Sequence, residues 1–354
     1  MKKQYTMTKI AILVSLCFVF IGCTIVVLEV YSSSFARVEE LSGNKVASMW
    51  YYIWDDIDQI KYSRKEVRFN SGENRLQGFI YGGTNNNGLV IISHGLGGTA
   101  DAYFPMIIYF ADKGWRVFAY NNTGVSGSEG ESIRGLNQSV IDLNAVLVYV
   151  KSSNELKNLP IMLVGHSWGG FAVCAVLNKE QNVKAVVSFA GYNTGSEVLK
   201  ENVVSMVGGI YYTLYPQFWA IEKQLFGDMA KLTAIDGINK SGIPSMIVQC
   251  ANDDVITPNG TSIYAHREKI TNPNTVTIYR EGENATGHEY TFCSKEQKAY
   301  IDWAKTSWKA YKAEHNNASI AQWAKEVDYD KAKANELDME LIEQVNDLFN
   351  NAIK

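Results

Sequence analysis

The stretch PIMLVGHSWGG, residues 160–170, decides the fold of this chain. Its first half is an apolar run typical of a buried strand, and it leads without a break into the pattern Gly-x-Ser-x-Gly. The residues up to Asn178 then have helix-like spacing. A strand that turns sharply into a helix lifts the hydroxyl of Ser167 above a sheet, and the small Gly165 and Gly169 let neighbouring backbone pass close. Ser167 is therefore the predicted nucleophile.

The same alternation of short apolar runs and longer helical patterns continues along the chain. The predicted strands lie at residues 88–93, 115–120, 160–164, 183–189, 244–249 and 276–279, and the predicted helices at 101–111, 140–151, 168–178, 259–270 and 296–312. This order is typical of βαβ units around a mostly parallel sheet. We expect an α/β fold with helices on both faces of that sheet.

Residues 192–242 are far too long for an ordinary connection between two strands. They also contain many bulky groups, among them Tyr211, Tyr215, Phe218 and Trp219. A plain surface loop would expose too much aromatic area to water. We therefore expect this segment to form a helical cap over the sheet.

A second apolar strand ends in the glycine-rich turn Ser93-His94-Gly95-Leu96-Gly97-Gly98. Glycines leave backbone amides unshielded, so such a turn can direct an N–H group at a developing oxyanion. The backbone amides of Leu96 and Trp168 are the predicted pair. His94 and His166 lie inside turn motifs, and we expect them to order these loops by hydrogen bonds instead of transferring protons.

A serine nucleophile needs a base and a carboxylate that orients the base. His288 follows the last predicted strand, and Asp253 and Asp254 follow the strand before it. The order Ser, Asp, His is expected when the three residues stand at successive carboxyl ends of a parallel sheet. Asp253 and Asp254 both lie where the acid is expected, and they compete for this position.

Together these motifs resemble the α/β-hydrolases, over roughly residues 65–312. The chain is most similar to the monoglyceride-lipase-like and prolyl-oligopeptidase-like branches. The family's usual spacing from the acid to a proline, here Pro258, fits Asp254 better than Asp253, which is then interpreted as a solvated turn carboxylate. The resemblance thus implies a Ser167–Asp254–His288 triad, supported by the loop residues His94, Gly95, Gly97, Gly165, His166 and Gly169. Asn121 and Thr123 depart from the pattern, because those relatives more often have Asp and Arg there.

The N-terminal segment is uncharged from Ile10 to Leu28. As a helix it is about 28 Å long, close to the thickness of the hydrocarbon core of a bilayer, about 30 Å. Lysines precede it and glutamates follow it, so the positive-inside rule places residues 1–9 in the cytoplasm and the rest outside. We expect an uncleaved single-pass anchor in the cell membrane. A cleaved signal peptide ending near Ser32 to Ser34 and a lipoprotein lipidated at Cys23 stay open as alternatives, which would make the protein secreted or lipid-anchored.

Two flanking segments carry less specific signals. Residues 29–64 contain Trp50, Tyr51, Tyr52 and Trp54, which suit a collar near the membrane, although they could also pack on the domain. The extension 313–354 ends in an amphipathic acidic helix. We expect it to dock on the same domain, with a self- or partner contact as the alternative.

Composition excludes several classes of protein. The chain has 354 residues, is 46% hydrophobic and 20% charged, and carries a formal net charge of −4. This leaves no basic excess for a nucleic-acid partner. The five cysteines form neither a disulfide framework nor a zinc motif, so we expect no metal and no cofactor. Cys174 and Cys250 are interpreted as buried apolar residues, and Cys293 as the same or a free thiol.

These features predict a serine hydrolase in which His288 deprotonates Ser167 and an acyl-enzyme forms. An aromatic cap near a membrane favours small-molecule or lipid esters, so carboxylesterase or lipase-like activity is the first choice. A serine exopeptidase of the same fold is the second. A catalytically silent binding or scaffold protein is the alternative from another class.

Overall fold

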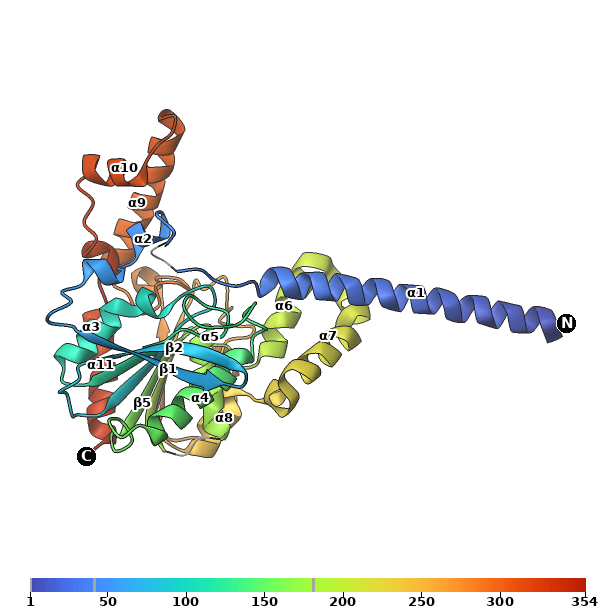
Figure 1. Cartoon of the computed structure of the whole chain (residues 1–354), viewed down its shortest axis with the longest axis horizontal. Helices are drawn as coiled ribbons and strands as arrows, with labels where there is room; N and C mark the ends of the chain where they lie inside the picture. The colour runs from blue at the N-terminus through green and yellow to red at the C-terminus, as the bar shows by residue number, and fades with distance from the viewer. Residues whose placement is uncertain (1, 41–42, 180–181) are drawn as a thin grey trace.

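A single eight-stranded sheet lies at the centre of the computed structural model, which describes residues 2–40, 43–179 and 182–354 (Figure 1). Its strand order is β1-β2-β4-β3-β5-β6-β7-β8, and the six strands from β4 to β8 in that order run parallel. The predicted α/β fold with a mostly parallel sheet is confirmed. The strands are β1 Arg64–Ser71, β2 Asn74–Tyr81, β3 Leu89–Ser93, β4 Arg116–Tyr120, β5 Ile161–His166, β6 Val183–Phe189, β7 Ser245–Cys250 and β8 Thr275–Arg280.

The two antiparallel strands at one edge, β1 and β2, were not among the predicted strands. β1 alternates exposed and buried positions along Val67, Phe69 and Ser71, so it lacks the continuous apolar run of the central strands. Gly72 has φ +59° in the tight turn that joins β1 to β2. This hairpin extends the sheet beyond the βαβ units.

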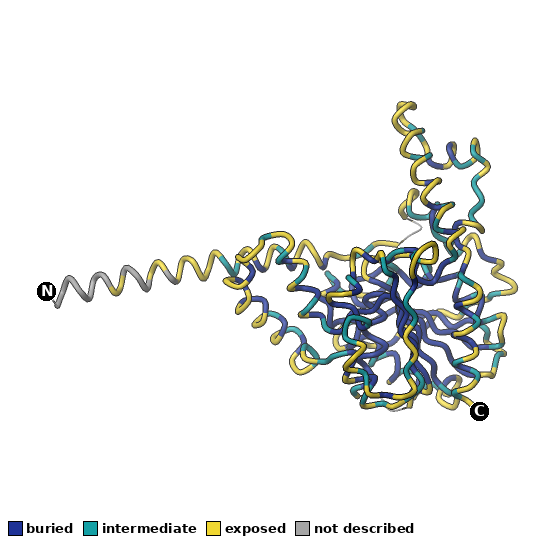
Figure 2. Tube along the Cα trace, turned by 180° about the vertical axis from the view of Figure 1, so that it is seen from behind, coloured by how far each residue is buried: buried dark blue, intermediate teal, exposed yellow. Residues whose placement is uncertain are grey.

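Helices cover both faces of the sheet, and side chains alternate between the two layers along each strand. On β3, Leu89 and Ile91 face one core, and Val90 and Ile92 face the other. The first face carries α4 Gln138–Ser152, α5 Trp168–Ala175 and α8 Ala234–Ser241, and the second carries α3 Phe104–Asp112, α9 Lys295–Glu314 and α11 Met339–Ala352. Figure 2 shows that the sheet and the inner sides of these helices form the buried interior.

The expected helix at 259–270 is reduced to a short 3-10 turn, Tyr264–Lys269. Tertiary pairing overrides the helical pattern there. Ser262 forms a β-bridge with Tyr192, and the amide of Ile263 donates to the carbonyl of Gly191 at 2.9 Å. These bonds hold the segment after Pro258 against the end of β6.

The cap is smaller than the expected range 192–242. It consists of α6 Gly195–Val207, α7 Tyr211–Phe226 and the short turns beside α7. The last helix of the range, α8, belongs to the layer on the sheet and packs on α5. A Cβ at Gly237 would lie 2.1 Å from the carbonyl oxygen of Cys174, so only glycine allows this close approach.

The N-terminal helix α1, Lys2–Ser34, projects from the globular body (Figure 1). An 18-residue window at Cys17–Ser34 has a mean hydropathy of 1.8, and 11% of it is buried. By length and composition this helix can cross a membrane. The globular body meets it only along its C-terminal part, where α6 and α7 lie beside it (Figures 1 and 2). Met1 of the expected cytoplasmic tail and residues 41–42 of the following segment lie outside the described residues.

The aromatic segment after α1 packs on the C-terminal extension, on a side of the body away from α1 (Figure 1). Trp50, in the short helix α2 Ala47–Trp50, has its ring 5.8 Å from Trp323 of α10 Ile320–Glu326. Asn335 accepts a hydrogen bond from the amide of Tyr52 at 3.2 Å. These contacts agree with the interpretation that the aromatic residues pack on the domain. The collar interpretation is wrong for Trp50.

The final helix, α11, buries its apolar stripe in the core. Phe349 lies 5.7 Å from the ring of Phe110 and 6.0 Å from that of Trp115. The indole of Trp115 also donates to Asn346 at 2.9 Å. The apolar side of this helix is therefore covered by the same chain.

Candidate active site

The turn between β5 and α5 holds Ser167 in a strained backbone conformation. Ser167 has φ +55° and ψ −113°, a region that residues with a side chain seldom adopt. A Cβ at Gly165 would lie 2.2 Å from the carbonyl oxygen of Gly169, and a Cβ at Gly169 would lie 2.0 Å from that of Ser93. Both positions therefore require glycine. The turn leaves the hydroxyl of Ser167 at the carboxyl end of β5, beside two cavities.

His288 connects Ser167 to a carboxylate. Its Nε2 lies 2.8 Å from the Oγ of Ser167, and its Nδ1 lies 2.9 Å from Oδ2 of Asp253 and 3.1 Å from Oδ1. Because Nδ1–H donates to the carboxylate, Nε2 is left to accept the proton of the hydroxyl. The Asp253 side chain is 0% exposed and that of His288 is 4% exposed. The three groups form the hydrogen-bonded chain that nucleophile activation requires.

The prediction that Asp254 supplies the acid is wrong. Asp254 is exposed, whereas the neighbouring Asp253 points into the site. The carboxylate of Asp253 caps the turn that follows β7, because its Oδ1 accepts the amides of Val255 at 3.0 Å and Ile256 at 2.8 Å. Gln249 donates to Oδ2 at 2.9 Å. These bonds turn the side chain of Asp253 toward His288. The spacing to Pro258, on which the choice of Asp254 rested, contains no information about these bonds.

The predicted oxyanion amides belong to two turns that meet at Ser167. The amide of Gly98 donates to the carbonyl of Gly95 at 3.1 Å, and Gly97 has φ +78°. This tight turn places Leu96 at its tip. Within the described part of the chain, neither the amide of Leu96 nor that of Trp168 donates to another protein group. Both N–H groups are therefore available to a ligand oxygen.

His94 and His166 are buried and neutral. Burial lowers the pKa of His94 to about 4 and that of His166 to about 3. Nε2 of His94 accepts the backbone amide of Asn122 at 3.1 Å, which fixes the loop after β4. The ordering role predicted for these two histidines agrees with these contacts.

Tyr103 is a site residue that sequence reasoning missed. Its hydroxyl accepts the amide of Gly95 at 2.9 Å and lies 2.8 Å from Nδ1 of His166. Nε2 of His166 in turn lies 2.9 Å from the carbonyl oxygen of His288. Since Nε2–H donates to that carbonyl, Nδ1 accepts from the tyrosine. This network ties the Leu96 turn to the loop that holds His288, and nothing in the spacing of Tyr103 indicated it.

Two cavities of different character meet at Ser167 and His288. A polar cavity of about 360 Å³ is lined by Tyr51, Tyr103, Glu289 and Lys305 together with the Gly95–Gly98 turn. An apolar cavity of about 210 Å³ lies on the other side. Its walls come from α6, from the turn after β7 and from the end of α1; they include Val30, Phe35, Leu136, Tyr192, Val198, Leu199, Val203 and Ile256. The arrangement suits a molecule with one polar and one apolar part.

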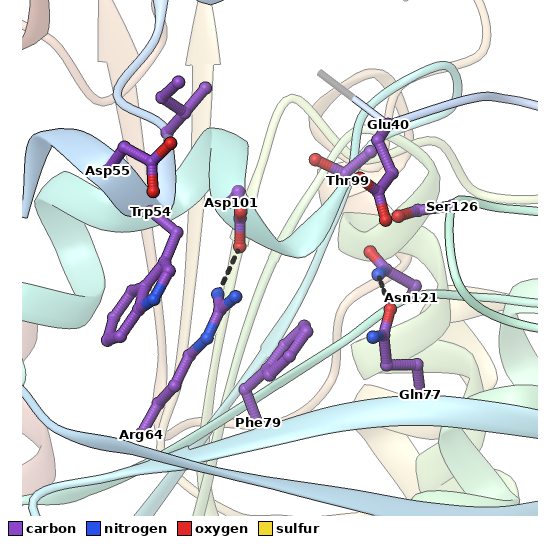
Figure 3. Close-up of a pocket in the computed structure, with 11 residues that line it drawn as sticks. Glu40, Trp54, Asp55, Arg64, Gln77, Phe79, Thr99, Asp101, Asn121 and Ser126 are labelled. Carbon is purple, nitrogen blue, oxygen red and sulfur yellow. Dashed lines mark hydrogen bonds and ion pairs between the residues drawn. The ribbon is translucent and has the colours of Figure 1, made fainter. Parts of the chain in front are cut away.

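A third cavity lies away from Ser167, at the edge of the sheet (Figure 3). Arg64 pairs there with Asp101 at 3.2 Å, and Asn121 donates to Gln77 at 3.0 Å. Asn121 also accepts the amide of Ala100 at 2.8 Å. The departure from the family pattern at Asn121 therefore serves to join the loop after β4 to its neighbours, and leaves the Ser167 site intact.

Comparison with known proteins agrees with this fold. Residues 84–263, about half of the chain, match the family model described as serine aminopeptidase, S33. The "Uncharacterized protein YfhR" of Escherichia coli O157:H7 and that of strain K12 are each 27% identical over 164 residues, which is 42% of this chain and 57% of theirs. The chain thus spans little more than half the length of these relatives.

Among solved structures, the esterase Pf2001 of Pyrococcus furiosus superposes with a TM-score of 0.51. The superposition covers 76% of this chain and 92% of the esterase, at 15% sequence identity. A second crystal form of the same esterase has the same TM-score and covers 94% of that chain. At this identity the likeness concerns the fold alone.

Proposed function

The chain belongs to the serine aminopeptidase S33 family of α/β-hydrolases, and from that premise we propose that it is a serine hydrolase of carboxylic esters. The observation that carries the proposal is the chain of contacts from Ser167 Oγ through His288 to Asp253, at 2.8 and 2.9 Å. In this proposal Asp253 is the acid, Ser167 is the nucleophile and His288 is the base. The last two roles are those that the sequence predicts.

The reaction follows from this geometry. Nε2 of His288 takes the proton of Ser167, whose oxygen attacks the ester carbonyl, and the amides of Leu96 and Trp168 stabilise the oxyanion. The imidazolium, held by Asp253, then gives its proton to the departing alcohol. Water, deprotonated by His288, attacks the acyl-enzyme and releases the acid while Ser167 recovers its proton.

The two cavities favour an ester over a peptide. Aliphatic and aromatic side chains line the smaller cavity, which can accept an apolar chain, and the polar cavity can take the other part of the substrate. We assign no metal and no cofactor to this reaction, because the triad supplies the nucleophile, base and acid that acyl transfer needs.

An exopeptidase is the second candidate, and one observation favours it besides the family description. Glu289 follows the base and lines both cavities. A carboxylate there could pair with the ammonium group of a peptide terminus. Lys305 lines the same polar cavity and opposes this, since its charge has the same sign as that ammonium.

We further propose that α1 anchors the protein in the cell membrane, with the catalytic domain on the outer side. The support is the length and hydropathy of α1 and the order of lysines before it and glutamates after it.

The test treats the full-length protein in detergent with a fluorophosphonate probe and maps the labelled residue by mass spectrometry. Hydrolysis of p-nitrophenyl esters is measured beside that of aminoacyl p-nitroanilides, with Ser167→Ala as control. We expect labelling at Ser167 and faster ester turnover. Preference for the anilides would favour the exopeptidase, and folded protein without labelling would favour the binding protein of the alternative class.

A further inference from the structure

The last turns of α1 are built into the globular body. Val27 and Tyr31 of α1, and Phe35 directly after it, are buried and recur every four residues, so they lie on the same side of the helix. The ring of Tyr31 lies 6.2 Å from that of Phe218 on α7. Directly after the helix, the carbonyl of Phe35 accepts the amide of Ile133 at 2.9 Å. The helix is therefore fixed to the domain and is more than a flexible tether.

An adjacent face of α1 lines the apolar cavity at the nucleophile. Val30 and Ser34 reach this cavity from α1, and Val198, Leu199, Val203 and Met206 reach it from α6. Ser34 and Met206 are exposed, which places the mouth of the cavity between α1 and α6. An apolar chain that enters here passes the helix on its way to Ser167.

Besides its wall of the apolar cavity, the cap has an exposed apolar surface on α7 that no other part of the described chain covers. Tyr212, Tyr215 and Trp219 are 65%, 48% and 51% exposed and share one side of α7, while Phe218 faces inward. The ammonium of Lys223 lies 4.9 Å from the ring of Trp219, and that of Lys200 lies 5.8 Å from the ring of Tyr212. Exposed aromatics with lysines beside them are typical of the headgroup region of a bilayer.

The cavity mouth and the exposed aromatic side of α7 both lie near the level at which α1 would leave the membrane. A helix of 33 residues is about 50 Å long, longer than the hydrocarbon core of about 30 Å. If the uncharged run from Ile10 to Leu28 spans that core, Val30 and Ser34 lie at the level of the outer headgroups. The cap is the part of the body beside this stretch of α1 (Figures 1 and 2). The cavity mouth then opens at the membrane surface.

We propose that α1 has a second role as a wall of the substrate cavity, and that the substrate is a lipid ester whose acyl chain enters from the outer leaflet between α1 and α6. This inference rests on the proposed ester hydrolysis and on the membrane anchor. It identifies the occupant of the apolar cavity as the acyl chain of a membrane lipid. The exposed side of α7 contacts the bilayer around the mouth.

The first experiment narrows the cavity from the side of α1. Val30→Trp is compared with Leu28→Trp in the full-length protein in nanodiscs; Leu28 is exposed and lies about 200° around the helix from Val30. We expect Val30→Trp to lower kcat/KM for a palmitoyl ester at least tenfold relative to that for an acetyl ester. Leu28→Trp leaves this ratio at the wild-type value. Val203→Trp narrows the same cavity from α6 and replaces Val30→Trp if that variant does not fold.

The second experiment tests the route. A fluorogenic long-chain phospholipid ester that does not exchange between vesicles is placed either in the same vesicles as the protein or in separate ones. We expect hydrolysis at least tenfold faster in the same vesicles. Equal rates, or a chain-length ratio unchanged in both Val30→Trp and Val203→Trp, would overturn the inference while ester hydrolysis stands. Absence of labelling at Ser167 in the wild type would instead overturn the proposed function.

Discussion

At the scale of single residues, the two neighbouring aspartates allow a sharp test of the triad. Asp253 accepts from His288 and from two backbone amides, whereas Asp254 is exposed. We expect Asp253→Asn to lower kcat for a p-nitrophenyl ester by on the order of a thousandfold, because the amide can no longer hold the required tautomer of His288. Asp254→Asn is expected to stay within about twofold of wild type. Comparable losses in both variants would contradict the assignment.

The hydroxyl of Tyr103 is expected to position the site without touching the substrate's reacting atoms. Tyr103→Phe leaves the Gly95 amide and Nδ1 of His166 without their partner, which costs about 1–3 kcal/mol. Since both the Leu96 turn and the His288 loop then lose support, kcat should fall about tenfold or more while KM changes little. Tyr300→Phe is the control, since its hydroxyl accepts the amide of Asp330 outside the site. A change confined to thermal stability would contradict a positioning role.

At the scale of secondary-structure elements, we expect the attachment of α7 to depend on pH. Burial raises the pKa of Glu222 from 4.5 to about 7, and Oε2 of this residue accepts from Asn137 at the start of α4 at 2.8 Å. The folded state therefore holds a proton that the unfolded state has lost above pH 4.5. This stabilisation is complete below pH 4.5 and is lost as the pH rises through 7.

From pH 5 to pH 8 the free energy of unfolding of the cap should thus decrease by up to about 3 kcal/mol more in the wild type than in Glu222→Gln. Hydrogen exchange of the α7 amides at the two pH values measures the difference. Lys223 and Lys231 line the cavity beside Glu222 and are present in both proteins, so the comparison cancels their contribution. Equal pH dependence in the two proteins would show that Glu222 does not control the cap.

The elements also show where sequence reasoning works and where it ends. Strands β3 to β7 are buried on both faces or nearly so, and each therefore appears as an apolar run that can be located from the sequence. β8 is exposed at Val276 and Thr277, but its β-branched residues still mark it as a strand. β1 alternates, and the 259–270 segment is held by contacts with Gly191 and Tyr192 that lie far away in the sequence. The nucleophile and base follow from local motifs, whereas the choice of Asp253 depends on a backbone turn.

At the scale of the whole molecule, α1 combines a segment that can span a membrane with a C-terminal part that packs on the domain. Its uncharged run indicates a membrane span, but the four-residue spacing of Val27, Tyr31 and Phe35 is equally compatible with exposure to lipid and with packing on protein. The contact of Tyr31 with Phe218 on α7 and the hydrogen bond between Phe35 and Ile133 show packing on protein. Because the helix is fixed to the cap, it sets the orientation of the catalytic domain relative to any membrane that it crosses.

This coupling predicts that a change in α1 alters the cap and leaves the sheet unaffected. Tyr31 is 7% exposed, and Tyr31→Ala opens a cavity between α1 and α7 that should cost about 3 kcal/mol. Local opening of α7 would then be about a hundredfold more frequent, which hydrogen exchange in nanodiscs detects as faster exchange of its amides. The amides of β5 and α5 should exchange as in the wild type. Leu28→Ala, at an exposed position of the same helix, should leave α7 unchanged. If Tyr31→Ala also left it unchanged, α1 would be a tether, and the cap would hold its position over Ser167 without it.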